Sequence, residues 1–115
     1  MDKELLKGNV AGLILAILSE EELHGYAIAR EIERRSESAL SFKEGTLYPA
    51  LHALEDKGFI KAQWETVKRG PSRKIYSLTE EGKNELERRR SVWVQFSTAI
   101  SSIMLPKGGG AADAS

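Results

Sequence analysis

Residues 44–78, EGTLYPALHALEDKGFIKAQWETVKRGPSRKIYSL, decide the fold. Leu47, Leu51 and Leu54 recur at the spacing of one helical face, so the stretch begins with a helix that buries this stripe. Gly58 stands where a left-handed residue would end that helix. The stretch therefore starts as one short helix that packs through its leucines.

A hairpin follows this helix at once. Ile60, Ala62 and Trp64 alternate with polar residues, which predicts a half-buried strand, and residues 73–78 supply the return strand. The pair Gly70-Pro71 marks the turn between them. A helix followed by such a hairpin predicts a winged helix-turn-helix, a mainly α fold with a small β-hairpin.

The charge of the chain is segregated. Seventeen basic and seventeen acidic residues cancel overall, but residues 57–74 carry six basic residues and one acidic residue, a net charge of plus five. Residues 1–56 carry six basic and eleven acidic residues. Such segregation places positive potential on the hairpin, as phosphate contact requires. A basic tip that only keeps an exposed strand edge soluble is the other interpretation.

The remaining helices follow from periodicity and capping. Apolar spacing predicts a helix over residues 3–18 and a second one from His24-Gly25-Tyr26 to about Arg35. Thr79 is a good N-cap for a last helix that runs to about Leu105. We expect a winged domain in residues 1–78, a dimerisation helix in residues 79–105 and a flexible tail in residues 106–115.

Pro49 conflicts with a regular third helix. Proline lacks an amide hydrogen and fits a helix only in its first turn. The sequence therefore predicts that residues 44–48 form an irregular start and that the regular helix begins late.

Composition disfavours several classes of protein. The chain has no cysteine and only two histidines, which excludes disulfides, makes zinc sites unlikely candidates and disfavours an enzyme. Its most apolar run, residues 10–18, is about half as long as a membrane-spanning helix. We expect a cytoplasmic protein without cofactor, metal or membrane.

Four separated motifs stand out along the chain, namely the runs LLKGNVAGLILAIL, LHGYAIAREIERRS, KEGTLYPALHALEDKGFI and GPSRKIYSLTEEGKNEL. Over roughly residues 4–95 they resemble the PadR family of bacterial transcriptional regulators. The resemblance implies a homodimer that binds a palindromic operator on double-stranded DNA and represses a promoter. Among PadR proteins, the chain is most similar to the small members with a single C-terminal helix.

Residues able to contact DNA gather on the third helix and the hairpin. The helix would enter the major groove and the hairpin tip would reach the backbone or the minor groove, with Arg69 as our choice for a narrow minor groove. Packing is the competing interpretation for Tyr26 and Tyr48, and metal binding is the weaker one for His52. The predicted DNA-binding residues are Tyr26, Lys43, Thr46, Tyr48, Pro49, His52, Lys68, Arg69, Ser72, Arg73 and Lys74.

The last helix predicts self-association. Apolar residues recur there on a seven-residue repeat, which is the pattern of a short coiled-coil-like seam. The predicted dimer interface comprises Leu86, Trp93, Phe96, Ile100 and Ile103.

The resemblance also implies a ligand site. In multidrug-sensing relatives a tryptophan from each subunit stacks planar aromatic compounds at the dimer interface, and Trp93 is similar in position. Ser97 replaces the acidic residue that attracts cationic drugs in such relatives, and Trp93 as a packing anchor is the competing interpretation. The matching positions are Leu5, Gly8, Ala11, Gly12, Trp93, Ser97 and Ile100.

A protein-interaction module with the same winged fold is the second hypothesis for function. In that case the third helix and the hairpin would bind a protein partner, and affinity for duplex DNA would not fall as the salt concentration rises.

Overall fold

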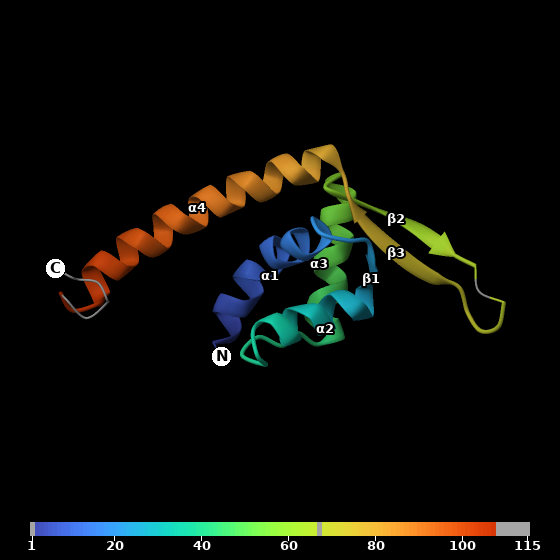
Figure 1. Ribbon diagram of the computed structural model, residues 1–115, viewed down its shortest axis with the longest axis horizontal. Helices are drawn as coiled ribbons and strands as arrows, with labels where there is room; N and C mark the ends of the chain where they lie inside the picture. Colours follow the sequence, from blue (N-terminus) through green and yellow to red (C-terminus); the bar gives the residue numbers. More distant parts are fainter. Residues whose placement is uncertain (1, 67, 108–115) are drawn as a thin grey trace.

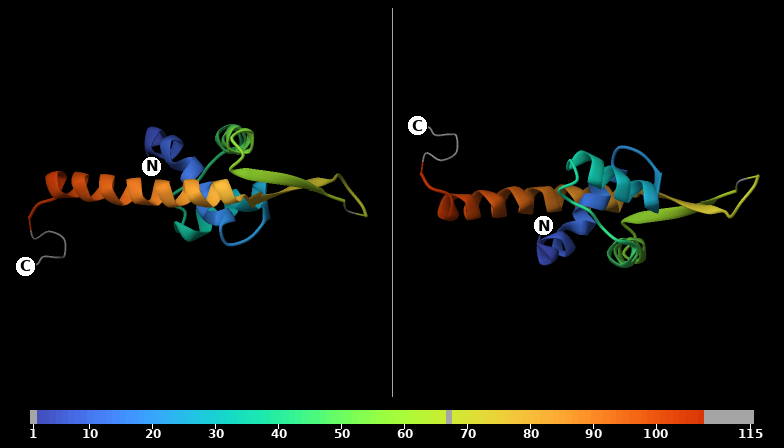
Figure 2. Two further views of the ribbon diagram at one scale, coloured as in Figure 1. Left: turned by 90° about the horizontal axis from the view of Figure 1, so that it is seen from above. Right: turned by 90° about the horizontal axis from the view of Figure 1, so that it is seen from below.

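The computed structural model describes residues 2–66 and 68–107 and has the predicted winged-helix architecture. The hairpin and the last helix extend from opposite ends of a small helical core, which gives an elongated molecule of 60 × 28 × 22 Å (Figures 1 and 2). In chain order the elements are α1 (Lys3–Leu18), β1 (Leu23–His24), α2 (Gly25–Arg35), α3 (Glu44–Asp56), β2 (Ile60–Glu65), β3 (Arg73–Leu78) and α4 (Glu80–Met104).

Helix α1 lies at the centre of the core, as its wide apolar arc predicts. It contacts α2, α3, α4 and β3, and the leucine stripe of α3 is buried against it as expected. Within the described residues no helix is both long and apolar enough to cross a bilayer. The buried core consists of Val10, Ile14, Leu15, Ile17, Leu18, Ile28, Ile32, Leu47, Leu51, Leu54, Ile60, Tyr76 and Leu86.

The sheet has one strand more than the predicted hairpin. Strands β2 and β3 pair antiparallel from Ile60 with Leu78 to Glu65 with Arg73. On its other edge β3 pairs with the two-residue strand β1, so the order is β1-β3-β2. The additional strand brings His24, just before α2, beside Ile75 in the middle of β3.

The predicted irregular start of α3 is wrong. The helix is continuous from Glu44 to Asp56 with Pro49 inside it. A proline at this position removes one backbone bond, the one to the carbonyl of Gly45, and Gly45 is exposed near the helix end, where solvent can replace that bond. At the other end Gly58 has a φ of 80°, as its predicted role in ending the helix requires.

Burial along β2 decreases toward the tip of the hairpin. Ile60 is buried and Ala62 is half-buried, but Trp64 is 67% exposed. The expected half-buried strand is therefore correct only near its root. The difference arises because the hairpin extends beyond the helices that could cover Trp64 (Figure 1).

The start of α4 is packed tightly against the turn between α3 and β2. The Thr79 hydroxyl donates to the carbonyl of Gly58 at 2.6 Å and accepts from the amide of Gly82 at 3.0 Å. A Cβ on Gly82 would lie 2.0 Å from the carbonyl oxygen of Phe59, so only glycine fits there. Thr79 is thus both the predicted N-cap and a link to the hairpin root.

One predicted interface residue belongs to the core instead. Leu86 is buried within the chain because the first turns of α4 pack against α1, and its side chain has little surface left for a partner. The seam predicted for dimerisation is therefore corrected to begin at Trp93. The predicted flexible tail lies outside the described residues from position 108 onward.

Replacing Gly82 with alanine should lower the free energy of unfolding by about 3 kcal/mol, because the added methyl group overlaps the Phe59 carbonyl. Chemical denaturation followed by circular dichroism, at one protein concentration, measures this loss. Gly45→Ala is the matched control, since a Cβ there meets nothing within 4 Å. Equal stabilities of the two variants would contradict the tight packing of α4.

Candidate nucleic-acid interface

The face of α3 opposite its leucine stripe is open to solvent. Pro49 and His52 are exposed, Tyr48 is partly exposed and Thr46 is half-buried at the N-terminal end. Lys43 is the N-cap residue of the helix and is also exposed. The structure therefore brings the residues predicted for this helix to its free side and first turns.

Tyr48 connects this helix to the start of α2. A Cβ on Gly25 would lie 3.0 Å from Cε1 of Tyr48 and 3.2 Å from its hydroxyl, so glycine at position 25 lets the ring of Tyr48 lie against the first turn of α2. The next residue, Tyr26, is 68% exposed, with the guanidinium of Arg30 5.5 Å from its ring centre. This exposure is unlike that of a packing residue and leaves the Tyr26 hydroxyl accessible.

The tip of the hairpin carries cations that have no ion-pair partner in the part of the chain that the structure describes. Lys68, Arg69 and Ser72 are exposed, and neither Lys68 nor Arg69 forms an ion pair with any residue that the structure describes. Arg73 is different, since its Nη2 lies 3.4 Å from Oε1 of Glu65. The same carboxylate oxygen lies 3.0 Å from Nε2 of His24, so Glu65 joins β1 to the end of β2 that is nearest the hairpin tip.

Lys74 is also engaged within the chain. Its ammonium lies 3.5 Å from Oε1 of Glu55 on α3 and within 6 Å of the ring centres of Trp64 and Tyr76, at 5.8 and 5.7 Å. Burial raises the pKa of the Tyr76 hydroxyl, while the nearby Lys74 ammonium acts in the opposite direction. Unlike the cations at the tip, Lys74 would contact a phosphate either by leaving the Glu55 carboxylate or by binding both anions at once.

The two adjacent arginines at the end of α2 are neutralised by nearby glutamates. Arg34 donates to Glu31 at 2.9 Å, and Arg35 donates to Glu31 at 3.1 Å and to Glu20 at 2.9 Å. The hydrogen bonds from Arg34 and Arg35 to Glu31 lower the pKa of that carboxyl to about 2. Arg34 and Arg35 are therefore less available to a phosphate than Lys68 and Arg69 at the hairpin tip.

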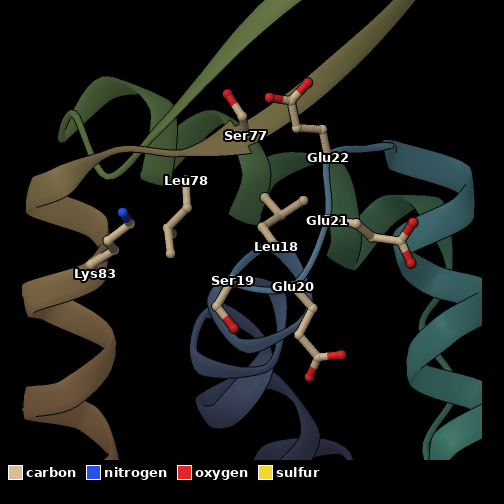
Figure 3. A pocket seen from close by; sticks show the side chains of 8 residues that line it. All are labelled: Leu18, Ser19, Glu20, Glu21, Glu22, Ser77, Leu78 and Lys83. Carbon is tan, nitrogen blue, oxygen red and sulfur yellow. The ribbon is translucent and has the colours of Figure 1, made fainter.

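Two surface hollows lie outside the α3 face. One lies between the turn after α1, the end of β3 and the start of α4; three glutamates and one lysine line it, so its negative charge disfavours phosphates (Figure 3). The other lies along α2, where Tyr26 and Arg30 contribute to its wall. No group of three His, Cys, Asp or Glu side chains within the described ranges could hold a metal ion, so the structure offers His52 no partner ligands there.

The residues matched to a ligand site lie on α1 and α4. Leu5 and Trp93 are exposed, and a Cβ on Gly8 would meet nothing within 4 Å, so that position is open space. Gly12 is different because Cδ of Arg89 lies 3.8 Å from its Cβ position, a neighbour that the sequence did not reveal. The remaining positions are partly buried Ala11 and Ser97 and exposed Ile100.

The chain matches the transcriptional regulator PadR-like family over residues 14–88, more than half of its length. The chain belongs to this family. Among PadR relatives, an uncharacterized protein of Lysinibacillus sphaericus is 32% identical over 101 residues, which cover 88% of this chain and 93% of that protein. The negative transcriptional regulator PadR of Bacillus subtilis is 36% identical over 73 residues, 64% of this chain and 40% of that regulator.

Solved structures of PadR-like proteins share the fold. A transcriptional regulator from Clostridium thermocellum superposes with a TM-score of 0.83 at 27% identity, covering 90% of this chain and 98% of that one. Bacillus subtilis PadR, solved in complex with operator DNA, superposes with a TM-score of 0.62 at 33% identity, covering 68% of this chain and 44% of that one. The chain therefore spans less than half the length of the Bacillus subtilis regulator and nearly all of the Clostridium one.

Proposed function

We propose that this PadR-like chain is a homodimeric repressor that binds a palindromic DNA operator through α3 and the hairpin. The observation that carries the proposal is a pair of exposed cations, Lys68 and Arg69, at the tip of the hairpin that follows α3, neither of which has an ion-pair partner among the residues that the structure describes. Cations without an internal partner are free to release counterions from a DNA backbone. Tyr48 and His52 on α3 supply the groups that face base edges or phosphates.

Self-association is supported by the second half of α4. This part of the helix extends beyond the core (Figure 2) and exposes apolar side chains on several sides. The rings of Trp93 and Phe96 lie there with their centres 6.5 Å apart. An exposed apolar surface of this kind needs a partner, and a second α4 is the simplest one. The exposed apolar residues of the segment are Val92, Trp93, Val94, Phe96, Ile100, Ile103, Met104 and Leu105.

A two-fold dimer accounts for a palindromic operator. Two copies related by a two-fold axis present their α3 helices to two half-sites of opposite direction, so the operator takes the symmetry of the protein. Repression follows when such a dimer covers a promoter.

A planar aromatic ligand at the dimer surface is the second part of the proposal. Trp93 is 54% exposed, and the open position at Gly8 and the exposed Leu5 lie on α1, the helix that packs beside α4. A ligand that stacks on Trp93 would alter how the two α4 helices pack and so weaken operator binding.

Removing Lys68 and Arg69 together, by alanine substitution, should weaken binding to every duplex alike and reduce the slope of log affinity against log salt by about two for each bound subunit. Fluorescence anisotropy with operator and unrelated duplexes over a range of salt concentrations measures both quantities. The matched control is Arg88→Ala with Arg90→Ala, which removes two paired cations from α4.

An unchanged slope in the hairpin variant would show that the tip does not bind phosphates. If the wild-type chain shows no salt-dependent affinity for DNA, the repressor proposal fails and the protein-interaction module becomes the better explanation.

Replacing Trp93 with alanine should abolish the quenching of tryptophan fluorescence by a planar aromatic compound such as quinoline, while Trp64 continues to emit. The same compound should lower the operator affinity of the wild-type dimer. Fluorescence titration and analytical ultracentrifugation, run side by side, separate ligand binding from dimer stability. If the Trp93→Ala variant is monomeric but the wild-type dimer never responds to the compound, Trp93 is a packing residue alone.

A further inference from the structure

Trp64 is an exposed tryptophan that the proposed interface does not use. It lies on β2 opposite Lys74 on β3, and 67% of its surface is open to solvent. Directly paired residues of an antiparallel ladder lie on the same face of the sheet. Since Lys74 reaches Glu55 on α3, this is the face that borders α3.

Lys74 contacts three other side chains at this place. Its ammonium lies near the rings of Trp64 and Tyr76 and pairs with the carboxylate of Glu55, and all of these groups except buried Tyr76 are accessible to solvent. The pair is long, at 3.5 Å, and about one third of each side chain is exposed. An exposed pair of this kind is weak, so a phosphate can compete with the carboxylate.

The site continues the proposed interface from α3 to the hairpin. Tyr48, His52 and Glu55 follow one another at four- and three-residue steps, so they form one flank of α3. Lys74 and Trp64 extend this flank onto the hairpin, whose tip carries Lys68 and Arg69. A DNA strand that lay along α3 and reached the tip would cross Trp64 and Lys74.

We propose that Trp64 and Lys74 form a further contact with the DNA backbone, and that Glu55 holds Lys74 when DNA is absent. A phosphate replaces the Glu55 carboxylate beside the Lys74 ammonium, and the Trp64 ring packs against the adjoining deoxyribose. A duplex rather than a protein is the occupant because residues 57–74 carry a net charge of plus five around the ring. This inference rests on the proposed function and adds contacts to the same interface.

Replacing Trp64 with alanine should lower affinity for all duplexes by roughly threefold to fivefold, because an exposed aromatic contact beside a cation is lost. The salt slope should not change, since no charge is removed. Gln63→Ala is the matched control, because Gln63 is exposed on the same strand but points to the other face. DNA should also change the tryptophan emission of the wild-type chain but not that of Trp64→Phe, which keeps Trp93.

Replacing Glu55 with glutamine should raise affinity roughly threefold at low salt, because Lys74 no longer has a competing carboxylate. When Lys74 is also replaced with alanine, the gain in log affinity from Glu55→Gln should fall by at least half. Lys74→Ala alone should reduce the slope of log affinity against log salt by about one per subunit. Chemical denaturation of all four members of the cycle shows whether the substitutions act through stability instead.

The outcomes separate this inference from the proposed function. If the wild-type chain binds DNA with a steep salt dependence but the Trp64 and Glu55 variants match it, the contact proposed here is wrong and the repressor proposal stands. If the variants change the free energy of unfolding but not the affinity for DNA, the cluster only stabilises the hairpin. Loss of the dimer in Trp64→Ala, with unchanged affinity per dimer, would assign the ring to contact between copies.

Discussion

The close approach of α4 to the turn between α3 and β2 is the constraint on which the rest of the structure depends. The backbone of Gly82 lies so near the Phe59 carbonyl that no side chain fits, and Thr79 bonds to both segments. One contact therefore fixes three directions: the end of α3, the root of the hairpin and the course of α4. The face that would meet DNA and the helix proposed for self-association are positioned from the same few residues.

Pairing, rather than the number of cations, distinguishes the basic segments. The end of α2 carries adjacent arginines, but carboxylates from α2 itself and from the turn after α1 neutralise them. The hairpin tip carries Lys68 and Arg69 without such partners among the described residues, and Lys74 takes an intermediate place because Glu55 holds it weakly. A chain of zero net charge thus concentrates its attraction for phosphate on one element.

The sequence predicted whatever is determined locally. The periodicity of α1 and the cap at Thr79 placed the helices, and the turn at Gly70 placed the hairpin. Strand β1 was missed because its two residues depend on β3, some fifty positions away. The same kind of distant contact pairs Lys74 with Glu55 and buries Leu86. The alternation of apolar residues along β2 could not show that the core ends before Trp64. The effect of Pro49 on α3 was overestimated, because the hydrogen bond that it removes lies near an exposed helix end.

Helix α4 is continuous, and its two ends have different surroundings. Its first turns are fixed to the root of the hairpin, and its exposed half is free to meet a partner. Twenty-five residues span about 37 Å, so a tilt of about 5° at the far end moves the near end by about 3 Å. In the proposed dimer, a small change in the angle between the two α4 helices would therefore alter the separation of the two hairpins, and with it the spacing of the half-sites that the dimer can bind.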